Sequence, residues 1–119
     1  MVSKDAIDAA ISAHGQWKKR LQDAISTGQS EFKPDAVKRD NACQFGQWLY
    51  SLPPDATKGE DFSKVQALHA EFHRTAGAIL ELALAGKKGE ALKQLDVSGQ
   101  YGAISGKLVL ALNGWKARI

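Results

Sequence analysis

Apolar residues recur at steps of three and four through the first part of the chain, a spacing that predicts an amphipathic helix. The helix is expected from Ser3, a suitable N-cap, to about residue 27, because Gly28 supplies a stop. One histidine falls on its apolar face, which consists of Ile7, Ile11, His14, Trp17, Leu21 and Ile25. The His14 ring is therefore expected to point inward, where a polar group needs a partner.

A second helix is expected over about residues 35–52, since the following Pro53 and Pro54 cannot continue a helix. Residues 53–60 are expected to form a loop. The second helix carries the one cysteine of the chain among its expected inward residues, which are Val37, Cys43, Phe45 or Trp48, and Leu49.

A third helix is expected over about residues 61–85, with Asp61 as its N-cap and Gly86 as its C-terminal stop. Its apolar stripe consists of Phe62, Val65, Leu68, Phe72, Ala76, Ile79 and Leu80. The remaining two histidines, His69 and His73, fall along the same side of this helix. All three histidines of the chain thus lie on or beside an apolar helix face.

Beyond Gly86 the pattern is less regular. Residues 89–95 are expected to form a short helix, the glycine-rich residues 97–102 a kink or break, and residues 103–116 a last helix. The alternation of period two that is typical of β-strands is absent. We therefore expect an all-α protein: a single domain, residues 1–119, folded as an antiparallel four-helix-type bundle with an additional short helix.

The charges of the chain are scattered, and they exclude some classes of function. The net charge is +3, but only Lys18, Lys19 and Arg20 form a run of three, whereas nucleic-acid binding needs a clustered basic surface. No segment has the roughly 18 consecutive apolar residues of a membrane span, and a signal-peptide pattern is absent. A single cysteine allows no intramolecular disulfide, as in a reducing compartment. We expect a cytoplasmic protein with no nucleic-acid or membrane partner.

The three histidines and the cysteine are candidate metal ligands. His69 and His73 are four positions apart, so both rings share one helix face. With His14 and Cys43 they offer four nitrogen and sulfur donors, as a closed tetrahedral zinc site requires. Antiparallel packing of the first and third helices is expected to bring His14 opposite the pair. On the residues alone, the alternative of three hydrogen-bonded histidines and an inert buried thiol is equally supported.

Catalysis is not expected at these residues. In the helix motif of zinc proteases a glutamate directly follows the first histidine, whereas Glu71 lies two residues after His69, rotated by about 200°. Four protein ligands also leave no position for a zinc-bound water. A thiol enzyme would need an oxyanion hole and a cleft, neither of which the sequence indicates. We therefore expect a protein that is not an enzyme.

Two residues near the cysteine have open interpretations. Asp40 lies one turn before Cys43, and we favour an exposed carboxylate over a group that orients a ligand histidine. Gly46 either permits a close helix approach near the metal or is simply tolerated. The aromatic side chains in these regions are expected to be core around the site, namely Trp17, Phe45, Trp48 and Phe72.

Three segments carry a family resemblance: residues 13–18 (AHGQWK), 40–50 (DNACQFGQWLY) and 69–73 (HAEFH). Together they resemble the chemoreceptor zinc-binding domain family, known as CZB. Its signature is a helix histidine, then Cys-x-Leu/Phe-Gly-x-Trp/Tyr, then His-x-x-x-His, and the cysteine motif matches at every defined position. The resemblance covers nearly the whole chain. It implies that one Zn²⁺ is held by His14, Cys43, His69 and His73.

The resemblance also implies a function. Domains of this family are cytoplasmic sensory modules of bacteria, attached to soluble chemoreceptors or diguanylate cyclases or standing alone, and they tend to form homodimers. The implied output is chemotaxis or cyclic-di-GMP signalling through a chemoreceptor or cyclase domain in cis or in trans. The implied input is oxidation of Cys43, for example by hypochlorous acid, or zinc occupancy itself. The alternative is a helical interaction or dimerisation module with a purely structural zinc.

Overall fold

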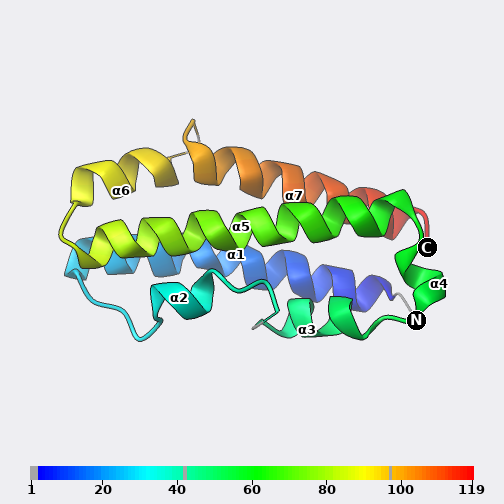
Figure 1. Ribbon diagram of the computed structural model, residues 1–119. Helices are drawn as coiled ribbons and strands as arrows, with labels where there is room; N and C mark the ends of the chain where they lie inside the picture. The colour runs from blue at the N-terminus through cyan, green and yellow to red at the C-terminus, as the bar shows by residue number, and fades with distance from the viewer. Residues whose placement is uncertain (1–2, 42, 97) are drawn as a thin grey trace.

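A computed structural model describes residues 3–41, 43–96 and 98–119, and within these residues the regular structure is entirely helical (Figure 1). The helices are α1 (Lys4–Thr27), α2 (Pro34–Val37), α3 (Gln44–Ser51), α4 (Pro54–Thr57), α5 (Glu60–Leu84), α6 (Lys88–Leu95) and α7 (Gln100–Ala117). The predicted all-α fold class is confirmed.

The two longest helices end where the sequence predicts. The Ser3 side chain accepts a hydrogen bond from the Ala6 N–H at the start of α1, as expected for an N-cap. Gly28 follows α1 with a φ of 72°, and Gly86 follows α5 with a φ of 80°. This left-handed conformation is readily available to glycine alone, so both residues stop their helices.

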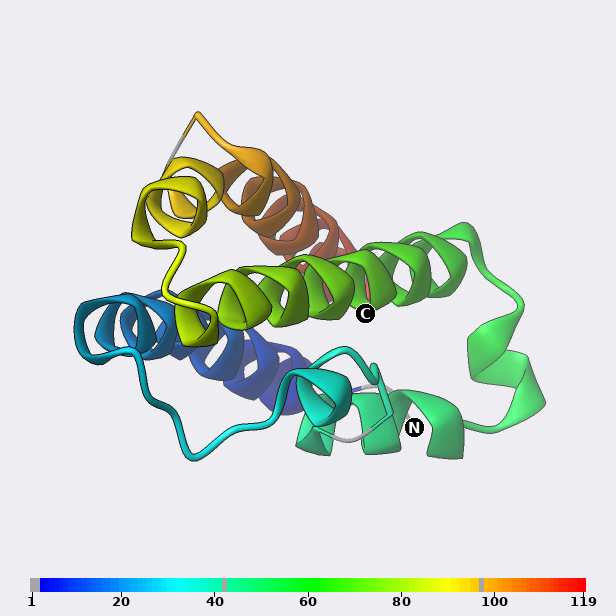
Figure 2. The ribbon, with the colours of Figure 1, turned by 60° about the vertical axis from the view of Figure 1, so that its left-hand side comes forward.

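The chain direction alternates between the long elements (Figures 1 and 2). Helices α1 and α5 run in the same direction. The α2–α3 segment, which connects them, and the α6–α7 segment, which follows α5, both run in the opposite direction. This is the up-down-up-down order of an antiparallel four-helix-type bundle. The expectation that the first and third helices are themselves antiparallel is wrong, because in this order alternate helices are parallel.

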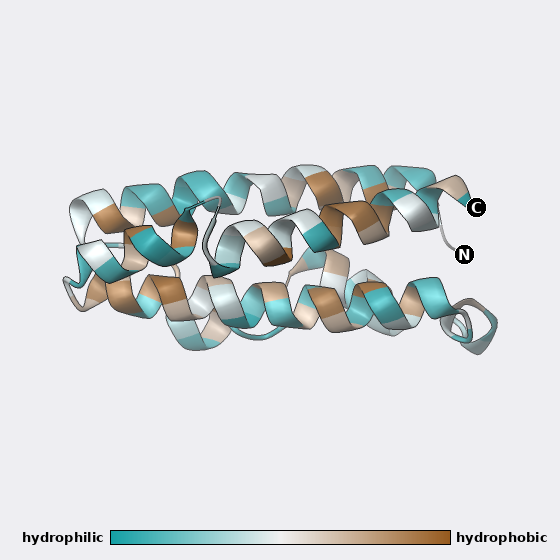
Figure 3. Cartoon of the chain, turned by 90° about the horizontal axis from the view of Figure 1, so that it is seen from above, coloured by the Kyte–Doolittle hydropathy of each residue, from teal (hydrophilic) through white to brown (hydrophobic). Residues whose placement is uncertain are grey.

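The apolar helix faces meet in one core along the bundle, whose dimensions are 45 × 25 × 19 Å (Figure 3). Helix α5 packs against α1, α2, α6 and α7, so it forms the centre of the fold. The largest fully buried apolar side chains are Phe72, Ile7, Leu21, Leu49, Ile79, Leu80, Leu108, Leu112 and Val65. Among the described residues, no helix combines the length and the apolar character that a membrane span requires.

The expected continuous helix over residues 35–52 is wrong. Helix α2 ends at Val37 and α3 begins at Gln44, and the described residues between them, 38–41 and Cys43, are not helical; Cys43 is the N-cap of α3. The carbonyl of Val37 accepts a hydrogen bond from His73 of α5, at 2.8 Å. A tertiary hydrogen bond to the last residue of α2 therefore accompanies the break in the helix. The helical periodicity of the sequence does not predict this hydrogen bond.

Three other boundaries differ from the expected ones. The expected loop over residues 53–60 contains α4, because a proline is favourable at the first position of a helix. Helix α5 begins at Glu60 with Gly59 as its N-cap, in place of Asp61. Helix α6 confirms the expected short helix, and α7 begins at Gln100, three residues earlier than expected. Val97, in the expected break, lies outside the described residues.

Candidate metal centre

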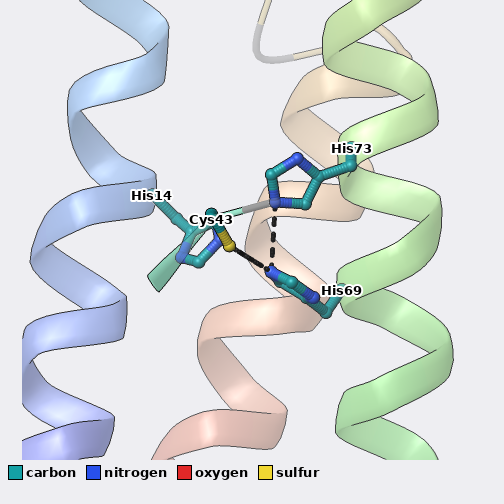
Figure 4. A group of neighbouring side chains, drawn as sticks. All are labelled: His14, Cys43, His69 and His73. Atoms are coloured by element: carbon teal, nitrogen blue, oxygen red, sulfur yellow. Dashed lines mark hydrogen bonds between the residues drawn. The ribbon is translucent and has the colours of Figure 1, made fainter. Parts of the chain in front are cut away.

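The structure brings all four candidate ligands together in the interior (Figure 4). His14 comes from α1, His69 and His73 come from successive turns of α5, and Cys43 comes from the start of α3. Their ligand atoms all lie within 4.8 Å of one another. Three segments that are far apart in the sequence thus present donors to one point.

One donor atom, His69 Nε2, lies close to each of the other three. His69 Nε2 lies 3.0 Å from His14 Nε2, 3.1 Å from His73 Nε2 and 3.3 Å from Cys43 Sγ. Bonds of about 2.0–2.1 Å from zinc to nitrogen place two such nitrogens about 3.3 Å apart in a tetrahedron. The three distances from His69 Nε2 are close to this spacing, so the four donors lie near enough to one another to coordinate one Zn²⁺.

The hydrogen bonds on the far side of the rings orient two donors. His14 donates Nδ1–H to the Ala10 carbonyl at 2.6 Å, and His73 donates Nδ1–H to the Val37 carbonyl at 2.8 Å. A neutral ring with its proton on Nδ1 carries a lone pair on Nε2. Both rings therefore aim a lone pair at the centre of the cluster, as zinc-bound histidines do.

His69 shows that hydrogen bonding alone does not satisfy this cluster. Its Nδ1 is buried and has no hydrogen-bond partner within the described part of the chain, and a metal at Nε2 would leave this atom as it is. Its Nε2 faces two lone pairs and a sulfur, and a single N–H can serve only one of them. Converging lone pairs are unfavourable without a cation. The donor set thus fits a bound metal ion, and the alternative of three histidines satisfied by hydrogen bonds does not explain it.

Burial sets the protonation of the metal-free centre. It lowers the pKa of His14 to about 4 and, with help from the neighbouring His73 and His14, lowers the pKa of His69 to about 2. Burial also lowers the pKa of His73 and raises the pKa of the Cys43 thiol. At neutral pH the three imidazoles are therefore neutral, which is the form that binds a metal.

The metal-free protein is expected to lose stability as the pH falls below about 6.5, the pKa of a histidine in the unfolded chain. His14 and His69 are protonated there in the unfolded state but stay neutral in the folded state. The unfolded state thus binds more protons, and each histidine lowers the free energy of unfolding by about 1.4 kcal/mol per pH unit. Urea denaturation of chelator-treated protein at about pH 7.5 and about pH 5.5 measures this; equal midpoints would contradict it.

Gly46 lets the irregular segment before Cys43 approach α3 closely. A Cβ atom at Gly46 would collide with the carbonyl oxygen of Asp40. The Gly46 N–H also donates a hydrogen bond to Cys43 Sγ at 3.2 Å. Gly46 is therefore more than tolerated: it permits a close approach of backbone beside Cys43, whereas the predicted approach of the helix to the metal stays a prediction.

The Asp40 side chain is half-buried and accepts a hydrogen bond from the Tyr50 hydroxyl at 2.7 Å. No hydrogen bond of its carboxylate to a ligand histidine is observed among the described residues. Burial lowers the pKa of His73 and raises the pKa of Cys43, and the negative charge of Asp40 partly offsets the first change and adds to the second. Asp40 is therefore neither a fully exposed carboxylate nor a direct partner of a ligand.

Two features that support the centre were missed by the sequence analysis. The carbonyl groups that hold His14 and His73 carry no side-chain signature, so residue patterns cannot reveal them. Gly77 also lies on α5 where α2 packs, since a Cβ atom there would collide with the Lys38 side chain and lie 3.1 Å from the Pro34 carbonyl oxygen. A glycine inside a long helix was the available signal for this close approach.

The residues between the two histidines of α5 agree with the expected roles. Glu71 is exposed and Phe72 is fully buried, so no carboxylate from this turn reaches the cluster. The Phe72 ring packs edge-on against the His14 ring, with 5.1 Å between centroids. Phe45 makes similar edge contacts with His14 and His69. Aromatic packing around the centre is thus as the sequence predicts.

A comparison with protein families matches residues 14–80, more than half of the chain, to the chemoreceptor zinc-binding domain (CZB). The chain belongs to the CZB family. The match begins at His14 and spans Cys43, His69 and His73, and CZB domains bind zinc, so Zn²⁺ is the cofactor of this chain. The family is one of zinc-binding sensory domains rather than of enzymes. Comparisons with curated proteins and with solved structures found no match.

Proposed function

We propose that this CZB domain is a cytoplasmic sensor of bacterial signal transduction, acting as one domain over residues 1–119. His14, Cys43, His69 and His73 hold the Zn²⁺, and the Cys43 thiolate reacts with hypochlorous acid. The observation that carries the proposal is the unequal burial of the four ligands. The three histidines are at most 5% exposed, whereas Cys43 is half-buried, and an open cavity of about 340 Å³ borders Cys43, His14 and His73.

The surroundings of Cys43 prepare its sulfur for this role. Bound zinc supplies the positive charge that keeps the sulfur deprotonated at neutral pH, which burial alone opposes. The Gly46 N–H points at the sulfur and stabilises its negative charge. The thiolate is the form that oxidants attack, so this sulfur combines reactivity with access.

The oxidation is a two-electron reaction at sulfur. The thiolate attacks the chlorine of hypochlorous acid, which forms an S–Cl bond and releases hydroxide. Water then replaces chloride at the sulfur and gives a sulfenic acid, with loss of chloride and a proton. The sulfur is oxidised, the chlorine is reduced to chloride, and the product is a much poorer metal ligand than the thiolate.

Loss of the sulfur ligand would release α3 without dismantling the bundle. Helix α3 has eight residues and packs mainly on α1, whereas α5 packs on α1, α6 and α7 independently of α3. The segment that carries Cys43 therefore depends on the metal more than the long helices do. A movement of α3 is the proposed output, read by a chemoreceptor or diguanylate cyclase domain in cis or in trans.

The test compares the wild type with Cys43→Ala and Cys43→Ser after exposure to one equivalent of hypochlorous acid. Zinc content and helicity by circular dichroism are measured before and after. We expect the wild type to release its zinc while most helicity persists, and both variants to hold zinc more weakly and to show no oxidant-dependent release beyond buffer. Zinc that stays bound to oxidised wild type would indicate a zinc sensor or a structural zinc module instead.

We also propose that the domain forms a homodimer through the outer face of α7. The inner residues of this helix are buried, while Leu110 on the outer face is 75% exposed, near the exposed polar residues Lys107 and Asn113. The small residues Ala103 and Gly106 are exposed on the same helix. A large exposed apolar side chain beside small residues offers a contact for a second copy of the chain.

Leu110→Glu is expected to prevent this association, because it places a charge at the centre of an apolar contact. Light scattering of the zinc-loaded protein should give twice the chain mass of 12.9 kDa for the wild type and the single chain mass for the variant. Leu92→Glu, at a residue that is 53% exposed on α6, is the matched control and should stay dimeric. A monomeric wild type, or a dimeric Leu110→Glu variant, would contradict the proposed interface.

A further inference from the structure

A cavity of about 340 Å³ adjoins the metal centre on the side of Cys43. Its wall is formed by α1, α2, the start of α3 and Phe32 of the α1–α2 connection. Among the ligands, Cys43, His14 and His73 border it. This volume lies at the small end of the range of about 300–1,000 Å³ that is usual for ligand pockets. A molecule with one ring and a short polar group is therefore the right size.

The described residues that line this cavity include two arginines and no carboxylate. Neither Arg20 nor Arg39 forms an ion pair within the described part of the chain. The guanidinium of Arg20 has five N–H donors, and among the described residues its one hydrogen bond is to Gln16 Oε1, at 3.3 Å. The cavity thus carries positive charge without a protein anion to match it.

The position of Arg20 is held by aromatic rings. Its guanidinium carbon lies 5.0 Å from the centroid of the Trp17 ring and 5.1 Å from that of the Phe32 ring. The two rings are in contact, with 5.1 Å between centroids. Phe45 provides a further apolar wall. A guanidinium held beside aromatic rings is suited to a ligand that has a carboxylate and an apolar ring. The carboxylate would pair with the guanidinium, and the apolar ring would pack against the aromatic side chains.

We propose that this cavity binds a small aromatic carboxylate. The carboxylate pairs with Arg20, with Arg39 adding charge, and the ring packs against Trp17, Phe32 and Phe45. Because Cys43 borders the same cavity, the bound ligand covers the sulfur and protects it from oxidants. This second part rests on the proposed oxidant response, whereas the binding itself does not.

Benzoate is the probe, and benzamide is its neutral counterpart of nearly the same shape. Each is titrated into zinc-loaded protein, and binding is followed by Trp17 indole and Phe32 signals in NMR spectra. We expect saturable shifts with benzoate, and binding of benzamide or of the Arg20→Met variant that is about tenfold weaker, as for a lost charge-assisted hydrogen bond. Arg39→Met should have a smaller effect, and Arg74→Met, at an exposed arginine outside the cavity, should have none.

Benzoate that causes no saturable shifts, or binding that Arg20→Met leaves unchanged, would overturn the proposal. The protection of Cys43 is tested by adding hypochlorous acid to zinc-loaded protein with and without saturating benzoate. We expect benzoate to lower the fraction of zinc released, and an unchanged fraction would overturn the protective role. Zinc content before oxidant is measured in the same samples, so failure of the zinc site is distinguished from failure of the cavity proposal.

Discussion

His69→Ala is expected to weaken zinc binding about a hundredfold or more, since structural zinc sites in small domains contribute about 10–16 kcal/mol through four ligands. His69 Nε2 lies within 3.3 Å of all three other donors, so its removal opens the centre of the cluster. The side chain is fully buried, and a cavity is left behind. Competition with a chromophoric chelator measures the affinity directly.

Glu71→Gln is the matched control, because Glu71 lies on the same turn of α5 but is exposed. It should bind zinc as the wild type does. If His69→Ala kept the wild-type affinity, or if Glu71→Gln lost it, the assignment of the four ligands would be wrong.

Gly46→Ala is expected to destabilise the zinc-loaded domain by about 1–3 kcal/mol and to weaken zinc binding. In an open helix position this change is favourable by about 1 kcal/mol. Here the added methyl group collides with the Asp40 carbonyl oxygen, which is backbone and cannot simply rotate away. The segment before Cys43 must then move, and the sulfur moves with it. Urea denaturation and zinc competition measure the two effects.

Gly15→Ala supplies the control for Gly46→Ala. Gly15 lies on α1 beside a ligand histidine, but a Cβ atom there meets nothing within 4 Å. The substitution should leave zinc affinity unchanged and make the domain slightly more stable. Equal effects of the two substitutions would show that the close approach at Gly46 is unimportant.

The long helices could be predicted from sequence because their own residues determine them. The apolar stripe of α1 fixes which side of the helix is buried, and with it the inward direction of His14, which is 5% exposed. Gly28 and Gly86 end helices through their own backbone conformation, a local property. The same periodicity places His69 and His73 on the buried face of α5.

The segment around the cysteine could not be predicted in the same way, because tertiary contacts determine it. The break between α2 and α3 accompanies a hydrogen bond from His73 to the Val37 carbonyl, and Gly77 allows α2 to approach α5. Neither contact has a local pattern. Cys43 is consequently an N-cap rather than a residue inside a helix, and it is the most exposed of the four candidate ligands.

The relative directions of α1 and α5 show the same limit. Matching apolar faces predict that two helices pack, but the direction depends on the segment that joins them. Here the α2–α3 segment spans the length of the bundle and returns the chain to its start, so the two helices are parallel (Figure 1). The candidate ligands still converge, since His14 needs only to face the part of α5 that carries His69 and His73 (Figure 4).

The metal content of the purified chain, never exposed to a chelator, tests the central claim most directly. Elemental analysis of the wild type and of His69→Ala, purified side by side, gives the zinc content per chain. One zinc per wild-type chain and a much lower content in the variant are expected. A wild-type protein without zinc, or a variant that retains a full equivalent, would contradict the claim that these three histidines and one cysteine form a zinc centre.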